Sequence, residues 1–291
     1  MVEIVYINGS LVPRSEARIS AFDHGFLYGY GLFETMRAYS GTIFLLERHL
    51  DRLKKSAKSI GIELSGIDLS QACRDTLKAN GLQSARIRLT VSNGDSGAFP
   101  WQEADNQPTV VISAREYQPF PPEIYEKGFK AGVSSFVRSR YSSLGGIKST
   151  NYLISVLTRR EMALIGLDEA LLLNEDGYIT EGSTSNIFFV KSSSLVTPPL
   201  ESGILPGITR ALVIEVAGTL GISVVEDNIT LADLPQFHEA FLTASTMEIM
   251  PLVMIKGQDG TVITIGSGKP GVMTKRLTAA YKEKVKKETG M

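Results

Sequence analysis

The proline-rich stretch from Gln118 to Pro122 is the feature that most constrains the fold. Three of its five residues are proline, so it is semi-rigid and cannot continue a helix or a central strand. A chain of 291 residues can also form two cores, because single cores tend to divide beyond roughly 250–300 residues. We therefore expect a domain over residues 1–117, a linker over 118–123 and a larger domain over 124–291.

The residues before this stretch predict antiparallel strands with two helices. Asn8-Gly9 favours the type I′ turn of a hairpin, and Ser40-Gly41 marks a second hairpin. Apolar residues at helical spacing predict amphipathic helices. Strands are expected within residues 3–12 on either side of the first turn, and over 32–39, 42–46, 85–92 and 109–114, with helices over 47–60 and 70–80.

The residues after the stretch also mix the two patterns. Strands are expected over residues 130–138, 170–173, 178–181, 186–190 and 241–245, and helices over 152–164, up to about 220 and over 272–286. Both halves of the chain are therefore expected to contain strands and helices together.

Composition excludes several classes of function. The formal net charge of −1, from 30 basic and 31 acidic residues, gives no electrostatic basis for binding nucleic acid or an anionic membrane. No apolar run approaches the roughly 20 residues of a membrane span, and Met1 to Glu3 leads into a strand pattern rather than a secretory signal. The single cysteine, Cys73, fits a reducing cytoplasm. The three histidines are scattered, so we expect no metal site.

Lys148 is the first candidate for chemistry. It lies in a flexible run of small residues, 145–151, directly before a predicted helix. Most lysines are solvated surface charges, but a lysine with a lowered pKa is a nucleophile toward aldehydes, and its commonest such partner is pyridoxal phosphate. That interpretation requires a phosphate site, a carboxylate for the pyridine nitrogen and a substrate pocket elsewhere in the chain.

Other segments offer candidates for these parts. Glu181 ends a strand before small polar residues, where a carboxylate is either exposed or able to reach a buried cofactor. Proline and glycine at 206–207 precede a helix whose free N–H groups suit a phosphate, and the hydroxyls at 243–246 could complete the site. Arg86 and Arg88 share one face of a strand, either as surface charges or as a carboxylate clamp.

Together these segments resemble the class IV aminotransferases, the fold-type IV pyridoxal-phosphate enzymes, over nearly the whole chain. The motifs occur in family order. They are His24 to Gly29 with Phe33-Glu34-Thr35, Arg48 to Leu53, Lys148 with Asn151-Tyr152, Glu181-Gly182 with Asn186, Leu205 to Arg210, and Thr243 to Pro251.

The resemblance implies a fold and a role for each site residue. It implies an α/β (α+β) protein with a small N-terminal α/β domain and a larger C-terminal pseudo-barrel domain, assembled at least as a homodimer. Lys148 would form the Schiff base with pyridoxal 5′-phosphate, Glu181 would pair with the pyridine N–H, and Tyr152 would lie beside the ring oxygen. The residues implied for the phosphate are Arg48, the amides of Ile208 and Thr209, and Ser245. Those implied for a small amino-bearing carboxylate substrate are Tyr28 of the neighbouring subunit, Phe33, Arg86, Arg88 and Thr246.

The resemblance leaves the reaction open. Thr35 matches the threonine by which aminodeoxychorismate lyases protonate the departing pyruvate, although Tyr30 and Asn93 depart from the aspartate and arginine often found in lyases. Branched-chain aminotransferases usually have Tyr-x-Arg at 86–88 and glycine at 35, and D-amino acid aminotransferases have Arg-x-His at 98–100. The pattern favours a lyase forming 4-aminobenzoate and pyruvate for folate synthesis. The alternative is an aminotransferase that uses 2-oxoglutarate with branched-chain L-amino acids or D-amino acids.

Overall fold

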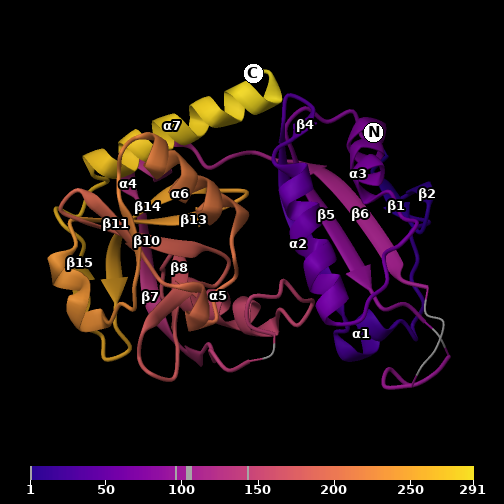
Figure 1. The fold of residues 1–291 in the computed structure, drawn as a ribbon, viewed down its shortest axis with the longest axis horizontal. Coiled ribbons are helices and arrows are strands. Elements are labelled where there is room, and N and C mark those ends of the chain that lie inside the picture. Colours follow the sequence, from indigo (N-terminus) through magenta and orange to yellow (C-terminus); the bar gives the residue numbers. More distant parts are fainter. Residues whose placement is uncertain (1, 96, 103–106, 143) are drawn as a thin grey trace. The chain divides into compact units, whose positions relative to one another are not determined.

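The computed structural model describes residues 2–95, 97–102, 107–142 and 144–291 (Figure 1). The chain divides into two compact units. The first unit comprises Met1–Gln118 with the short segments Ile147–Asn151 and Val285–Met291, and the second comprises Pro119–Gly146 and Tyr152–Lys284. By this division the segment that carries Lys148 belongs to the first unit, although it follows the proline-rich stretch in the sequence.

The first unit is built on a six-stranded antiparallel sheet with strand order β2-β1-β6-β5-β3-β4. The strands are β1 (Ile4–Ile7), β2 (Ser10–Pro13), β3 (Gly31–Tyr39), β4 (Thr42–Ile43), β5 (Ala85–Ser92) and β6 (Thr109–Glu116), and the helices are α1 (His24–Tyr28), α2 (Leu46–Ser59) and α3 (Leu69–Ala79). Helices α2 and α3 cover one face of the sheet, where the apolar core lies (Figure 1).

Both hairpin turns lie where the sequence predicted them. Asn8 and Gly9 have φ angles of 46° and 94°, the positive values that a type I′ turn requires, and they connect β1 to β2. The strand expected over residues 42–46 ends early, at Ile43. Leu45 adopts a left-handed conformation with φ 53°, which breaks the extended chain and lets α2 begin at Leu46.

The two faces of this sheet differ in chemistry because side chains alternate along each strand. Met36 of β3 and Ile87 of β5 are fully buried against the helices. The opposite face carries Phe33, Thr35 and Arg37 from β3, together with arginines from β5 and β6. The helix-free face is therefore aromatic and strongly basic.

The segment 147–151 pairs with the edge of β3. Ser149 forms an isolated antiparallel bridge with Leu32, the Phe33 amide donates to the Lys148 carbonyl at 2.9 Å, and the Thr150 amide donates to the Gly31 carbonyl at 2.9 Å. These backbone bonds fix the position of Lys148 within the first unit.

The second unit is built on a nine-stranded mixed sheet. Its order is β12-β11-β10-β13-β14-β7-β8-β9, with β15 paired to β14, and β9 also contacts β10, so the sheet curves into a half-barrel. The strands are β7 (Phe129–Val137), β8 (Glu169–Leu173), β9 (Ile179–Gly182), β10 (Asn186–Lys191), β11 (Ser194–Thr197), β12 (Val224–Glu226), β13 (Glu239–Ala244), β14 (Glu248–Lys256) and β15 (Val262–Thr264). The helices are α4 (Pro122–Lys127), α5 (Leu153–Leu164), α6 (Ile208–Thr219) and α7 (Val272–Thr289), with short 3₁₀ turns at Leu200–Ser202 and Leu231–Gln236. No helix in the described part of the chain is long and apolar enough to cross a bilayer.

Candidate active site

Lys148 and Phe33 lie on the helix-free face of the first sheet. Because Leu32 and Ser149 are bridge partners, Lys148 lies across from Phe33 and the two side chains project to the same side. The Lys148 Nζ atom lies 4.7 Å from the centre of the Phe33 ring. The guanidinium carbon of Arg88 lies 3.3 Å from the same ring centre. One buried aromatic ring therefore holds a lysine amine and a guanidinium close together.

Thr35 lies beside this group, since it is the direct cross-strand partner of Arg88. The Arg88 Nε atom also donates to the Thr90 hydroxyl at 3.2 Å, which fixes the guanidinium along its own strand. The substrate residues Phe33, Arg86 and Arg88 expected from sequence, and the candidate catalytic residues Thr35 and Lys148, thus share one face.

A row of three arginines crosses the same face. Arg86 is paired in register with Arg37 on one side and with Arg115 on the other. Like charges directly opposite one another destabilise a sheet, and the structure offsets this at both ends of the row. The Arg37 guanidinium lies over the rings of Tyr39 and Tyr117, at 4.3 and 4.8 Å, and Arg115 pairs with a glutamate at 2.9 Å. The face is therefore suited to carboxylate binding. Sequence analysis missed Arg37, although its position two residues after Thr35 was a usable signal.

A buried charged cluster lies on the opposite, helix-covered face of β3. Glu34 accepts a hydrogen bond from His49 Nδ1 at 2.7 Å and two from Arg52, Nε at 2.8 Å and Nη2 at 2.6 Å. Burial alone would raise the pKa of Glu34, but the hydrogen bond from His49 and the charge of Arg52 outweigh it and lower the pKa to about 2. Burial also lowers the pKa of His49, against the opposing effect of Glu34, so His49 is neutral at pH 7 and donates to the carboxylate.

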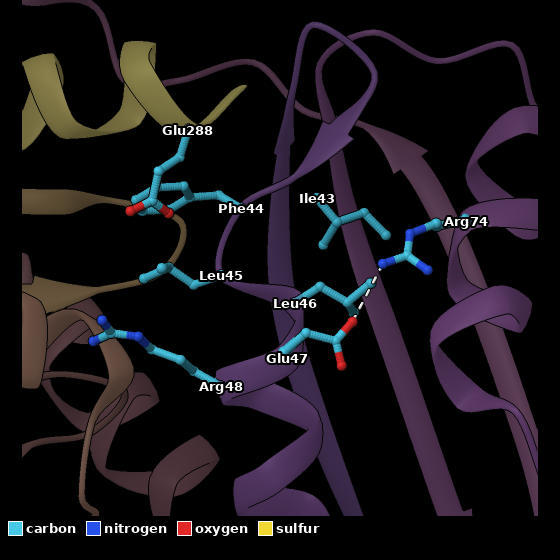
Figure 2. A pocket seen from close by; sticks show the side chains of 8 residues that line it. All are labelled: Ile43, Phe44, Leu45, Leu46, Glu47, Arg48, Arg74 and Glu288. Atoms are coloured by element: carbon cyan, nitrogen blue, oxygen red, sulfur yellow. Dashed lines mark hydrogen bonds and ion pairs between the residues drawn. The ribbon is translucent and has the colours of Figure 1, made fainter. Parts of the chain in front are cut away.

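Arg48 is the neighbour of His49 in the first turn of α2. Figure 2 shows the open pocket that it lines, in which Glu47 forms an ion pair with Arg74 at 3.2 Å and Arg48 points away from that pair. The start of α2 therefore sets the direction of the Arg48 side chain, and the buried cluster around Glu34 fixes the orientation of α2.

Tyr28 ends α1 and is half exposed, with its ring edge-on to His24 at 5.6 Å. His24 is buried, and its ring nitrogens contact the Ala98 carbonyl at 3.1 Å and the Asn93 side-chain amide at 3.2 Å. The Tyr30 hydroxyl donates to the Ile60 carbonyl at 2.5 Å. Asn93 and Tyr30, the two positions that depart from the lyase pattern, thus have structural hydrogen bonds.

In the second unit, Glu181 is buried and held at both oxygens. Its Oε1 atom lies 3.0 Å from Arg138 Nε, while Oε2 accepts from the Leu205 amide at 2.9 Å and from Asn186 Nδ2 at 3.3 Å. A guanidinium beside a buried carboxylate favours its ionised form. Such a carboxylate can keep a pyridine nitrogen protonated. Sequence analysis did not identify Arg138, which lies just past the end of β7.

The loop after Glu181 is fixed by a second buried carboxylate. Glu169 of β8 accepts hydrogen bonds from the hydroxyls of Ser183 and Ser185, the latter at 3.1 Å, and lies 3.4 Å from an Arg159 nitrogen. The Tyr152 hydroxyl in turn donates to the Ser183 carbonyl at 3.5 Å. Glu169 therefore positions the loop that follows Glu181 and that the Tyr152 hydroxyl contacts, and nothing in the local sequence indicated that role.

The start of α6 has the properties of an anion site. Gly207 caps this 12-residue helix without a side chain, so the first-turn amides, including those of Ile208 and Thr209, have no intrahelical acceptor. A Cβ atom at Gly207 would lie 1.9 Å from Asn186 Oδ1, so only glycine allows this close approach. Ser245 and Thr246 follow the end of β13 in the same unit.

Comparison with known proteins decides the family. The model of the amino-transferase class IV family matches residues 31–255. The chain is 41% identical over 284 residues to a putative branched-chain-amino-acid aminotransferase of Methanocaldococcus jannaschii, covering 96% of this chain and 95% of the relative. It is 33% identical over 287 residues to the aminodeoxychorismate lyase of Bacillus subtilis, covering 97% and 95%. The chain belongs to the class IV aminotransferase family.

A solved structure of the same family agrees with the fold. The branched-chain amino acid aminotransferase of Escherichia coli matches with a TM-score of 0.90 and 34% identity, over 97% of this chain and 94% of that one. The predicted α/β fold of type IV is confirmed. Class IV aminotransferases are pyridoxal-phosphate enzymes, so this chain is one as well. The free amides of α6 suit a phosphate, and the ion-paired Glu181 suits a protonated ring nitrogen.

Two further observations concern other chemistry. Among the described residues no group of three or more histidine, cysteine, aspartate or glutamate side chains could hold a metal ion. Cys73 is buried, and burial raises the pKa of its thiol to about 12, so it is not a nucleophile at neutral pH.

Proposed function

We propose that this enzyme is an aminotransferase that moves an amino group between a branched-chain L-amino acid and 2-oxoglutarate. The arrangement of Lys148, Phe33 and Arg88 supports this proposal. An aminotransferase must accept two different side chains in one site, an apolar one and a carboxylate in this case. Arg88, stacked on the buried ring of Phe33, offers the charged contact for the carboxylate beside the lysine. The 41% identity to the archaeal relative supports the same choice.

The roles of the remaining residues follow from the resemblance and the geometry. When bound, pyridoxal phosphate withdraws electrons from the substrate carbon that carries the amino group. Lys148 would hold the cofactor and then move the proton at that carbon, and Glu181, which is ion-paired with Arg138, would hold the proton on the ring nitrogen. The phosphate would be held by Arg48, Ile208, Thr209 and Ser245, and the ring oxygen by Tyr152. For the substrate carboxylates we propose Arg86, Arg88 and the Thr246 amide.

An aminodeoxychorismate lyase remains the second candidate, because Thr35 lies on the face of Lys148 where it could protonate departing pyruvate. We rank it second because the Asn93 side chain is hydrogen-bonded to His24 and the Tyr30 hydroxyl is hydrogen-bonded to the Ile60 carbonyl. A folate-pathway role depends on that candidate alone.

The visible spectrum of the purified enzyme separates the candidates. L-Leucine and L-glutamate should each bleach the cofactor band by converting the cofactor to its amine form, while D-alanine should not. Bleaching by D-alanine alone would indicate a D-amino acid aminotransferase. An unchanged band with every amino acid, together with pyruvate released from 4-amino-4-deoxychorismate, would establish the lyase and contradict our proposal.

Replacing Arg88 by leucine should affect the two substrates unequally. We expect KM for L-glutamate and 2-oxoglutarate to rise about 10–100-fold, because a charged hydrogen bond to the side-chain carboxylate is lost, while KM for L-leucine changes less. Steady-state kinetics of both half-reactions measure this. Arg115→Leu is the matched control, since Arg115 lies on the same face but is paired with Glu3. Equal losses for both substrates would show that Arg88 does not discriminate side chains.

We further propose that the enzyme is a homodimer. Helix α5 buries small polar residues such as Ser155 and Thr158 and exposes Leu153, Val156 and Leu164, at 67%, 54% and 77%. An exposed apolar helix face of this kind marks a protein interface. Light scattering should give twice the chain mass of 31.7 kDa. Leu153→Asp with Val156→Asp should yield monomers, and a monomeric unmodified enzyme would contradict the proposal.

A further inference from the structure

The ring of Phe33 has two cations beside it. Phe33 is 2% exposed, the Lys148 Nζ atom lies 4.7 Å from its ring centre, and the Arg88 guanidinium carbon lies 3.3 Å from the same point. A cation within about 6 Å of a ring centre is attracted to the electron-rich face of the ring, most strongly where water is excluded. The ring therefore offers a binding surface to the charged form of the Lys148 amine, and Arg88 shares that ring.

The strand order shows how both cations reach the ring. Leu32 pairs with Val91 of β5 at one edge of β3 and with Ser149 at the other edge. The segment that carries Lys148 and strand β5 are therefore the two neighbours of β3 at this point, and their cations come to Phe33 from opposite sides of the strand. The Phe33 amide donates to the Lys148 carbonyl at 2.9 Å, which keeps the lysine level with the ring.

Two neighbours of Lys148 in the first unit disfavour its charged form. Arg88 carries a positive charge on the same ring, and like charges close together disfavour ionisation. His49 feels the lysine as well, because burial lowers the pKa of His49 and the charge of Lys148 adds to that effect. The ring of Phe33 acts in the opposite direction, since its face attracts the amine only when the amine is charged.

We propose that Phe33 is a positioning residue that holds the Lys148 ammonium between two proton transfers. In the role proposed for Lys148, a substrate amine replaces it on the cofactor, and the two hydrogens of that amine pass to Lys148, which leaves as a primary amine. Lys148 then takes the proton of the substrate carbon, whose bonding electrons stay behind, and becomes an ammonium. The ring face holds this ammonium until it gives the proton to the carbon to which Lys148 was bonded. The inference rests on the proposed function only in requiring that Lys148 is the lysine that bonds the cofactor.

The test measures the reactivity of Lys148 in the cofactor-free protein, so it does not depend on turnover. Trace acetic anhydride at neutral pH acetylates uncharged amines, and mass spectrometry gives the rate on the peptide that contains Lys148 relative to the exposed Lys54. Mono-, di- and trifluorinated phenylalanine at position 33 keep the ring shape while withdrawing electrons from its face. We expect each added fluorine to speed acetylation, by about 2–10-fold over the series, and Phe33→Leu to speed it as well.

Phe188 is the matched control, because it is fully buried and stacks on Phe241 rather than on a cation. Its fluorination should leave the Lys148 rate unchanged. Arg88→Leu should slow acetylation, because the ring is then left to Lys148 and a neighbouring positive charge is gone. Looser packing would instead speed the reaction in both Phe33→Leu and Arg88→Leu, and that result would overturn the inference.

A second readout follows the proton itself. With L-leucine that carries deuterium on the carbon bearing the amino group, the fraction of label that the enzyme delivers rather than loses to water should fall as fluorines are added at Phe33. A rate of acetylation and a delivered fraction that are both independent of fluorine number would overturn the inference and leave the aminotransferase intact. Cofactor trapped by borohydride on a lysine other than Lys148 would overturn the proposed role of Lys148 instead.

Discussion

Replacing Lys148 by alanine is expected to reduce turnover at least about 10³-fold, because in the role proposed for Lys148 the chain then loses both its covalent link to the cofactor and the amine that moves the proton. The fold should persist, since the bonds that attach this segment to β3 are made by backbone atoms at Phe33 and Lys148 and by the bridge at Ser149. The variant should therefore keep its melting temperature in the cofactor-free form.

Borohydride reduction followed by mass spectrometry measures the covalent link directly. The unmodified enzyme should retain the reduced cofactor on a peptide that contains Lys148, and Lys148→Ala should retain none. Lys54→Ala is the control, because Lys54 is exposed on α2 and far from this chemistry in sequence. Cofactor trapped on another lysine of the unmodified enzyme would contradict the role proposed for Lys148.

Much of the first unit could be predicted from local sequence. Asn8-Gly9 and Ser40-Gly41 adopt the left-handed angles that their turns require, and α2 follows its apolar spacing. The same information could not place the segment 147–151, because its pairing with β3 joins residues more than a hundred positions apart. Loop 147–151 has no periodic pattern of its own, so only the tertiary structure shows which face Lys148 occupies.

The candidate site was predictable where a residue type determines the chemistry. A lysine among small residues indicates a candidate nucleophile, and glycine and proline before a helix indicate an anion site, so both signals can be read from a few neighbouring residues. The residues that support the site give no such local signal. Arg138 contacts Glu181 from just past the end of β7, Glu169 of β8 holds the loop after Glu181, and Glu34 meets His49 and Arg52 across the sheet–helix interface. Charged residues of these types are usually solvated, and only burial distinguishes them.

The second large effect is expected at Glu34. Replacing it by glutamine should lower the free energy of unfolding by about 3–5 kcal/mol, because Arg52 and His49 lose the carboxylate that they share inside the core. For a chain of this size the melting temperature should fall by roughly 6–20 °C. Urea unfolding and calorimetry measure both quantities. Glu47→Gln is the matched control, because Glu47 lies on α2 with His49 and Arg52 but its ion pair with Arg74 is exposed and contributes little.

The pH dependence distinguishes the lost charge from a mere loss of packing. Glu34 and His49 both have folded-state pKa values below their usual 4.5 and 6.5, so each takes up a proton more readily in the unfolded chain, and acid favours unfolding. The unmodified enzyme should therefore lose stability below about pH 6.5 through His49, and again between 4.5 and about 2 through Glu34. In Glu34→Gln the second loss should be smaller, so the two stability curves should converge as the pH falls through this range. Curves that stay parallel below pH 4.5 would show that the carboxylate is not the charged partner of Arg52.

Glu34 is fixed on the helix-covered face, and its neighbours Phe33 and Thr35 must then face Lys148. The same cluster that stabilises the fold therefore sets the register of the site.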